Sequence, residues 1–221
     1  MEQDSVDNGK RGRIWSILGL LFFLIGLPYG SYVYLKKGYD YQKDALSQLR
    51  KDQLLPAPTG LSLLWGEAPA SQEEGTMHIV GLLPASAGNR LPDYGNLLQR
   101  LHQQFDAPAN IEFWTILESK DSAFVSDYRQ FHALPVDTAQ LLFWTASPEA
   151  MSNYSAALQL TEEEKAYYPE GIIVLTDIQG YVRKAYRLDD EAEVKQLVGL
   201  IAMLLPERKK EKPVVRREAE R

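Results

Sequence analysis

The fold class is decided by three consecutive segments: HIVGLL (78–83), YGNLLQRLHQQF (94–105) and IEFWTIL (111–117). The first and third are short apolar runs of the kind found in buried strands. The middle segment places its leucines and a phenylalanine at helical spacing on one face, which predicts an amphipathic helix. A strand, a helix and a second strand in this order favour a right-handed crossover between parallel strands. The sequence therefore predicts an α/β domain.

The same alternation continues and then changes. Residues 171–176 (GIIVLT) and 181–186 (YVRKAY) are joined by the tight turn DIQG, which predicts an antiparallel hairpin. The sheet is therefore expected to be mixed. TEEE at 161–164 predicts a capping box with Thr161 as N-cap. The remaining predicted elements are helices at 122–132, 148–158 and 191–205 and strands at 61–65 and 139–144.

An uncharged segment precedes this domain. Residues 14–35, IWSILGLLFFLIGLPYGSYVYL, contain no charged side chain, and an apolar helix needs roughly 20 residues to cross the hydrocarbon core. A cleaved secretory signal would have a shorter apolar core and a small-residue cleavage site. We therefore predict an uncleaved transmembrane helix. The basic residues on its two sides do not decide its orientation.

The chain carries a net charge of -6, but the charge is unevenly distributed. The last sixteen residues contain seven Lys or Arg and four Glu, a balance of +3, so the rest of the chain carries -9. This acidic part of the chain would repel a phosphate backbone, and no nucleic acid partner is expected.

The sequence divides into five predicted parts. They are an N-terminal tail (1–13), a transmembrane helix (14–35), a juxtamembrane helix at 38–55 within a linker (36–60), the α/β domain (61–205) and a basic, disordered tail (206–221).

The sequence lacks the residues for most site chemistry. It contains no cysteine, which excludes disulfides, thiolate nucleophiles and Cys-ligated metals. It also lacks both glycine-rich phosphate-binding motifs and the serine nucleophile elbow. His102 and Asp106 are an i, i+4 pair, which we interpret as a solvated helix pair. His78 lies at a strand start and His132 at a helix end, where a cation favours the helix dipole, and we interpret both as structural. No catalytic, metal-binding or cofactor-binding residue is predicted, and the protein is not expected to be an enzyme.

Three stretches resemble the SCO family of cytochrome oxidase assembly proteins. LLFWTASPEAMSNYSAALQL (141–160) resembles that family's W-x-F-L-T-G-x-P-E segment, and IIVLTDIQGYVRKAY (172–186) resembles its L-V-D-x-x-G hairpin. HIVGLLPASAG (78–88) occupies the place of the strand leading into the metal-binding loop. The resemblance covers about Met77–Leu205. It implies a thioredoxin-like fold with a central mixed sheet flanked by helices, behind one membrane span, on the extracytoplasmic face of a bacterial inner membrane or, as a second setting, at a mitochondrial inner membrane.

The departures from that family concern its site. Its chemistry depends on C-x-x-x-C and a distant His, whereas the overlay places Ser86 and Arg90 at the two cysteines. Directly before the strand at 171–176, where that His would be expected, stand Tyr167, Tyr168 and Pro169. Soft thiolates select Cu(I), so neither copper transfer nor thiol exchange is expected. The loop 84–93 is instead predicted to bind a protein partner, with any exposed aromatic residues forming an apolar patch beside it. The candidate residues are Ser86, Arg90, Asp93, Tyr167 and Tyr168.

Three functions follow as hypotheses. The first is a non-catalytic assembly or accessory factor whose partners are the lipid bilayer and a respiratory membrane complex of the cytochrome oxidase type, as the resemblance implies. The second is a permanent structural subunit of a membrane complex, since Gly19 and Gly26 lie seven residues apart on one helix face and permit close approach. The third is a thiol-independent enzyme or a metal site built from histidines and carboxylates.

Overall fold

The computed structural model consists of two compact units, residues 1–49 and 50–221. The part of the chain that the structure describes comprises residues 15, 20, 22–47, 49–50, 52–68, 75–106 and 110–205.

The first unit is helical. A short π-helical turn, η1 (Phe22–Gly26), continues into α2 (Leu27–Ser47). Within the described residues, no helix has both the length and the apolar character that a membrane span requires. The predicted span at 14–35 includes positions 14, 16–19 and 21, which lie outside the described residues.

The second unit is built on a six-stranded sheet in the order β1-β4-β3-β2-β5-β6. β2, β3 and β4 are parallel, while β1 pairs antiparallel with β4, and β5 pairs antiparallel with both β2 and β6. The predicted mixed sheet is confirmed. The strands are β1 (Ser62–Trp65), β2 (Met77–Leu83), β3 (Ile111–Glu118), β4 (Leu141–Ala146), β5 (Ile172–Thr176) and β6 (Val182–Arg187).

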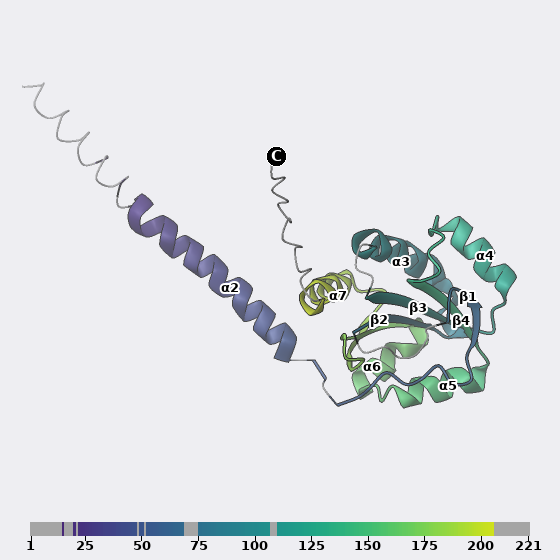
Figure 1. Cartoon of the computed structure of the whole chain (residues 1–221). Helices are drawn as coiled ribbons and strands as arrows, with labels where there is room; N and C mark the ends of the chain where they lie inside the picture. The colour runs from purple at the N-terminus through teal and green to yellow at the C-terminus, as the bar shows by residue number, and fades with distance from the viewer. Residues whose placement is uncertain are drawn as a thin grey trace, which may run out of the picture. The chain divides into compact units, whose positions relative to one another are not determined.

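Helices cover both faces of this sheet, with α3 and α4 on one face and α5 and α6 on the other (Figure 1). The predicted capping box is present, because the Thr161 hydroxyl accepts from the Glu164 N–H and the Glu164 carboxylate accepts from the Thr161 N–H. The helices are α3 (Leu91–Phe105), α4 (Ser122–Phe131), α5 (Pro148–Ala157), α6 (Glu162–Tyr167) and α7 (Glu191–Leu204), with the 3₁₀ turns η2 (Ala85–Arg90) and η3 (Tyr168–Glu170).

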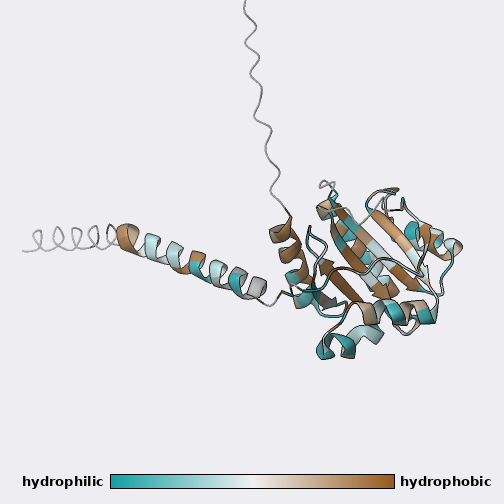
Figure 2. Ribbon diagram, turned by 60° about the horizontal axis from the view of Figure 1, so that its bottom comes forward, coloured by the Kyte–Doolittle hydropathy of each residue, from teal (hydrophilic) through white to brown (hydrophobic). Residues whose placement is uncertain are grey.

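The core lies on both sides of the sheet, whose strands are largely apolar (Figure 2). β2 is buried along its whole length. Trp114 and Trp144 pack with Met151 and Tyr154 of α5 on one side. The aromatic residues of β3 and β4 are therefore core residues, as the alternation along these strands predicts: Phe113, Trp114, Phe143 and Trp144.

The segment after residue 49 differs from the prediction. Helix α2 ends at Ser47, whereas the sequence predicts a helix up to Leu55. Arg50 and residues 52–55 instead run along the free edge of β6, with hydrogen bonds from Val182 N–H to Gln53 O (2.7 Å) and from Leu55 N–H to Gly180 O (2.8 Å). The pairing satisfies backbone groups at the sheet edge and buries Leu55 in the core. This tertiary gain outweighs the helical spacing of the leucines.

Candidate functional site

The candidate loop lies at the carboxyl end of β2, beside the start of β5, because these two neighbouring strands are antiparallel. η2 follows the end of β2, and η3 precedes the start of β5, so the two turns meet. The Ser86 hydroxyl donates a hydrogen bond of 2.7 Å to the Pro169 carbonyl. The Ala85 N–H donates one of 3.0 Å to the Glu118 carboxylate at the end of β3. η2 is therefore hydrogen-bonded to η3 and to the end of β3.

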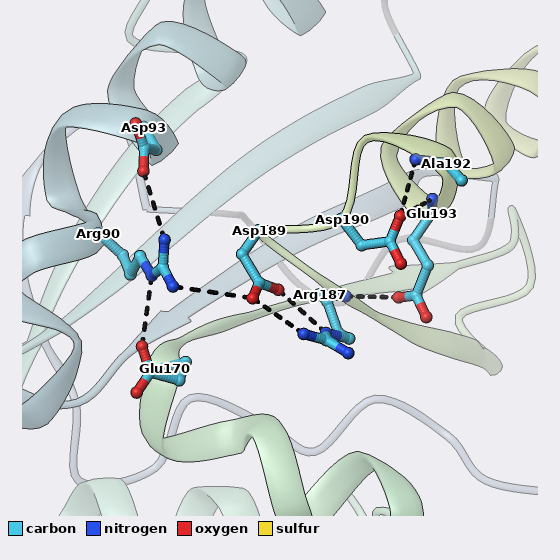
Figure 3. Close-up of polar contacts among 8 residues, drawn as sticks. All are labelled: Arg90, Asp93, Glu170, Arg187, Asp189, Asp190, Ala192 and Glu193. Carbon is cyan, nitrogen blue, oxygen red and sulfur yellow. Dashed lines mark hydrogen bonds and ion pairs between the residues drawn. The ribbon is translucent and has the colours of Figure 1, made fainter.

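Arg90 ends η2 and lies among three carboxylates (Figure 3). Its guanidinium is 3.3 Å from Glu170 Oε2, 3.7 Å from Asp189 Oδ2 and 3.8 Å from Asp93 Oδ2. Arg187 binds Asp189 from the other side with two hydrogen bonds, of 2.9 and 3.0 Å. The hydrogen bond from Arg187, together with the charges of Arg187 and Arg90, holds the pKa of the Asp189 carboxyl below its usual value. Arg90 therefore joins η2, α3, η3 and the turn before α7.

The predicted tyrosines lie next to this cluster but do not form an exposed patch. Tyr167 and Tyr168 are half-buried and pack against the core cluster below the sheet. Burial raises the pKa of both hydroxyls. The Arg187 guanidinium lies 5.7 Å from the centre of the Tyr167 ring. The two tyrosines therefore do not form the predicted exposed apolar patch. Their rings pack against the core, and the groups at the surface here are charged.

We name the resulting exposed region the η2–η3 surface. The structure brings Ser86, Arg90 and Asp93 together on it, with Tyr167 and Tyr168 at its base. Sequence reasoning missed three of its members, Glu170, Arg187 and Asp189. Their charges are spread over distant segments, and only the pairing of β5 with β6 brings them to Arg90. The residues of the η2–η3 surface are Ser86, Arg90, Asp93, Tyr167, Tyr168, Glu170, Arg187 and Asp189.

A groove of about 630 Å³ continues from this surface between α3 and α7. Leucines and valines of both helices, among them Leu97, Leu101 and Val198, form its floor. Arg90 and Asp189 belong to the lining at one end. The groove and the η2–η3 surface are therefore continuous.

The histidines do not form a site. His102 is buried, and its Nε2 lies 2.9 Å from Asp137 Oδ2, so the predicted pairing with Asp106 is wrong. His102 is on the inward face of α3, against Phe113, where Asp137 reaches it from the loop before β4. Among the described residues, no group of three or more His, Asp and Glu is arranged to hold a metal ion.

His132 is also buried, with its Nδ1 3.1 Å from Asn96 Oδ1. Burial lowers its pKa, which favours the neutral imidazole. His132 therefore has the structural role that the sequence predicts, but its burial does not favour the cation that a helix end would stabilise. Its ring instead fills the space above Gly95, where a Cβ would lie 2.4 Å from the imidazole.

The similarity of this chain to known proteins lies in its fold. No family model and no curated protein matches the chain. A candidate protein disulfide isomerase from Bacteroides thetaiotaomicron has a TM-score of 0.52 at 15% identity, covering 71% of this chain and 91% of that one. A thiol:disulfide interchange protein from Bacteroides sp. has a TM-score of 0.50 at 11% identity, covering 74% and 95%. The second unit has a thioredoxin-like fold.

The thioredoxin-like fold agrees with the predicted architecture, but the likeness extends no further than the fold. A SCO1/SenC family lipoprotein from Bacillus anthracis str. Ames is also similar, with a TM-score of 0.43 at 13% identity, covering 60% of this chain and 83% of that one. Such a score does not distinguish one thioredoxin-like family from another. The thiol chemistry named for the Bacteroides proteins has no counterpart in a chain without cysteine.

Proposed function

We propose that this protein is a membrane-anchored accessory factor that binds a membrane protein complex through the η2–η3 surface and catalyses no reaction. One observation carries the proposal. Ser86 and Arg90, which stand where the SCO-like overlay places two cysteines, are engaged in contacts within the domain. A hydroxyl bonded to a backbone carbonyl and a guanidinium between carboxylates present no nucleophile and no metal ligand. What they provide is an ordered, charged surface.

The charge of this surface indicates the chemistry of the partner. Arg90 and Arg187 face five carboxylates within the turn and its neighbours, a balance of -3. The five are Asp93, Glu170, Asp189, Asp190 and Glu193 (Figure 3). Complementary potentials favour correct orientation and fast association at an interface. The proposed partner is therefore a membrane protein with a basic patch next to the bilayer.

The membrane anchor and the respiratory setting belong to the same proposal. The uncharged segment 14–35 supports an anchor, and the resemblance to SCO proteins supports an extracytoplasmic domain at a bacterial inner membrane, serving a cytochrome oxidase or related complex. Extraction of native membranes at alkaline pH tests the anchor, because an integral protein stays in the pellet. Protease treatment of intact spheroplasts tests the orientation, because an extracytoplasmic domain is digested.

Affinity purification of the full chain from its native membrane in mild detergent tests the binding function. Respiratory subunits, identified by mass spectrometry, are expected to co-elute with the wild type. Arg90→Glu removes the cation that joins Asp93, Glu170 and Asp189, so these carboxylates lose their fixed arrangement and recovery of the partner should fall roughly tenfold, as for an interface hot spot. Lys165→Glu, which makes the same charge change at an exposed position of α6, is the control and should leave recovery unchanged.

The stoichiometry of the same purification separates an assembly factor from the alternative of a permanent subunit. A permanent subunit would be retained in equal amounts with the complex through every detergent step. A transient factor would be lost in part. A solitary protein, or equal recovery with a normally folded Arg90→Glu variant, would contradict the proposed binding function.

A further inference from the structure

The α3–α7 groove has an apolar floor and one acidic end. Its floor contains Leu97 and Leu101 of α3 and Val194 and Val198 of α7. The two leucines are buried, whereas the two valines remain partly exposed. A groove whose α7 wall carries partly exposed apolar side chains can accept further apolar groups.

The two ends of the groove differ in charge. At the end next to η2, Arg90 and Arg187 face the carboxylates of Asp93, Glu170 and Asp189. Asp190 and Glu193, which cap α7 and the end of β6, add to the negative potential there. Farther along the walls, Lys195 is paired with Glu191 at 2.9 Å, and the charge of Arg100 also acts on Glu191. The acidic end therefore favours a basic group.

The sequence that follows α7 has the complementary pattern. Residues 206–221, PERKKEKPVVRREAER, contain seven Lys or Arg and four Glu. Two valines, Val214 and Val215, follow Pro213 and are followed at once by Arg216 and Arg217. This order places a short apolar group directly before two cations, as the groove places its apolar floor directly before its acidic end.

The chain is long enough to connect the two. α7 has 14 residues, which corresponds to a helix of about 21 Å. The ten residues from Pro206 to Val215 span up to roughly 33 Å when extended. A chain that turns back at Leu205 therefore reaches the valines of α7 and then the acidic end. Because the segment is attached to a wall of the groove, its effective concentration there is on the order of millimolar.

We propose that residues 206–221 dock into the α3–α7 groove of the same molecule. Val214 and Val215 lie over the apolar floor, and Arg216 and Arg217 bind the carboxylates of Asp93 and Asp189. The docked segment covers one flank of the η2–η3 surface.

The absence of cysteine makes a direct test possible, since introduced cysteines are the only ones present. Gln104→Cys on the groove wall is combined with Val214→Cys in the full chain, purified in detergent. The control combines Val214→Cys with Ala156→Cys, an exposed position of α5 on the opposite face of the sheet. Under mild oxidation, the groove pair should form an intramolecular disulfide at least roughly tenfold faster than the control pair, because docking holds the two thiols together.

Two further conditions test whether charge attraction contributes to the proposed docking. Salt at 0.5 M, which shortens the Debye length to roughly 4 Å, should slow closure of the groove pair, and so should Arg216→Glu with Arg217→Glu. Equal closure rates for the groove and control pairs would overturn the proposal, and so would closure unaffected by salt and charge reversal. Disulfide-linked dimers in place of closed monomers would assign the groove to a second copy and would also overturn it. None of these measurements needs the partner, so the result is independent of the proposed binding function.

Discussion

Ser86 and Pro169 are joined by a hydrogen bond of 2.7 Å between the serine hydroxyl and the proline carbonyl. The bond connects η2 to η3 across 83 residues of sequence. It lies at the position where the SCO-like overlay places a metal-binding and redox-active thiol. In this structure, the end of β2 at that position is closed by the hydrogen-bonded contact between η2 and η3.

Removing this hydroxyl should weaken the contact without unfolding the domain. We expect Ser86→Ala to lower the free energy of unfolding by about 0.5–1.5 kcal/mol, the usual net value of one hydrogen bond. Urea denaturation followed by near-ultraviolet circular dichroism measures the change. Ser122→Ala at the exposed start of α4 is the control, and an equal effect of both substitutions would contradict the role of Ser86.

The pairing of Arg50 and residues 52–55 with β6 should depend on the Arg50 side chain. Its guanidinium pairs with the buried carboxylate of Glu164, which also accepts from the backbone N–H groups of Thr161 and Ala185. We expect Arg50→Gln to cost about 1–3 kcal/mol, because a buried carboxylate loses its charged partner. Lys165→Gln breaks an exposed pair with Glu162 and should cost less than about 0.5 kcal/mol. Similar losses in the two variants would show that the pairing with β6 does not rely on this ion pair.

Gly81 should tolerate no side chain. An added Cβ would lie 2.3 Å from the hydroxyl oxygen of Tyr94, which is buried and 2.8 Å from the Thr115 hydroxyl. We expect Gly81→Ala to destabilise the domain by about 1–3 kcal/mol through overpacking. At Gly88, no atom lies within 4 Å of an added Cβ, so Gly88→Ala should be neutral or slightly stabilising. A thermal melt that places the two variants together would refute the packing argument.

The buried imidazole of His132 should make stability depend on pH. Burial lowers its pKa in the folded state, so below about pH 6.5 the unfolded chain binds more protons than the folded one. The free energy of unfolding should therefore fall as the pH is lowered from 7 to 5, and His132→Asn should remove that part of the slope. Urea titrations of both proteins at each pH provide the comparison. Equal slopes would mean that His132 titrates alike in both states.

Much of the fold was accessible from local patterns. The apolar runs and the helical spacing between residues 78 and 117 predicted β2, α3 and β3, and the box at Thr161–Glu164 predicted the start of α6. These features depend on residues within a few positions of one another. Such interactions are encoded in short stretches of sequence.

The missed features depend on distant residues. Arg90 was recognised, but Glu170 and Asp189 come from segments 80 and 99 positions away, and no local spacing connects them to Arg90. His102 forms its hydrogen bond with Asp137 rather than with Asp106, because the inward face of α3 packs against the loop before β4. The segment at 52–55 belongs to a stretch with leucines at helical spacing but gains more from pairing with β6. In each case tertiary contact decided between local alternatives.

The measurement that tests the binding function most directly is photo-crosslinking in the native membrane. A photoreactive residue replaces Asn89, which is exposed in η2, or Gln130, which is exposed in α4. The account predicts one discrete crosslinked membrane protein from position 89, lost when Arg90→Glu is added, and no such product from position 130. Absence of a product at position 89, or the same product from both positions, would contradict a partner-binding role for the η2–η3 surface.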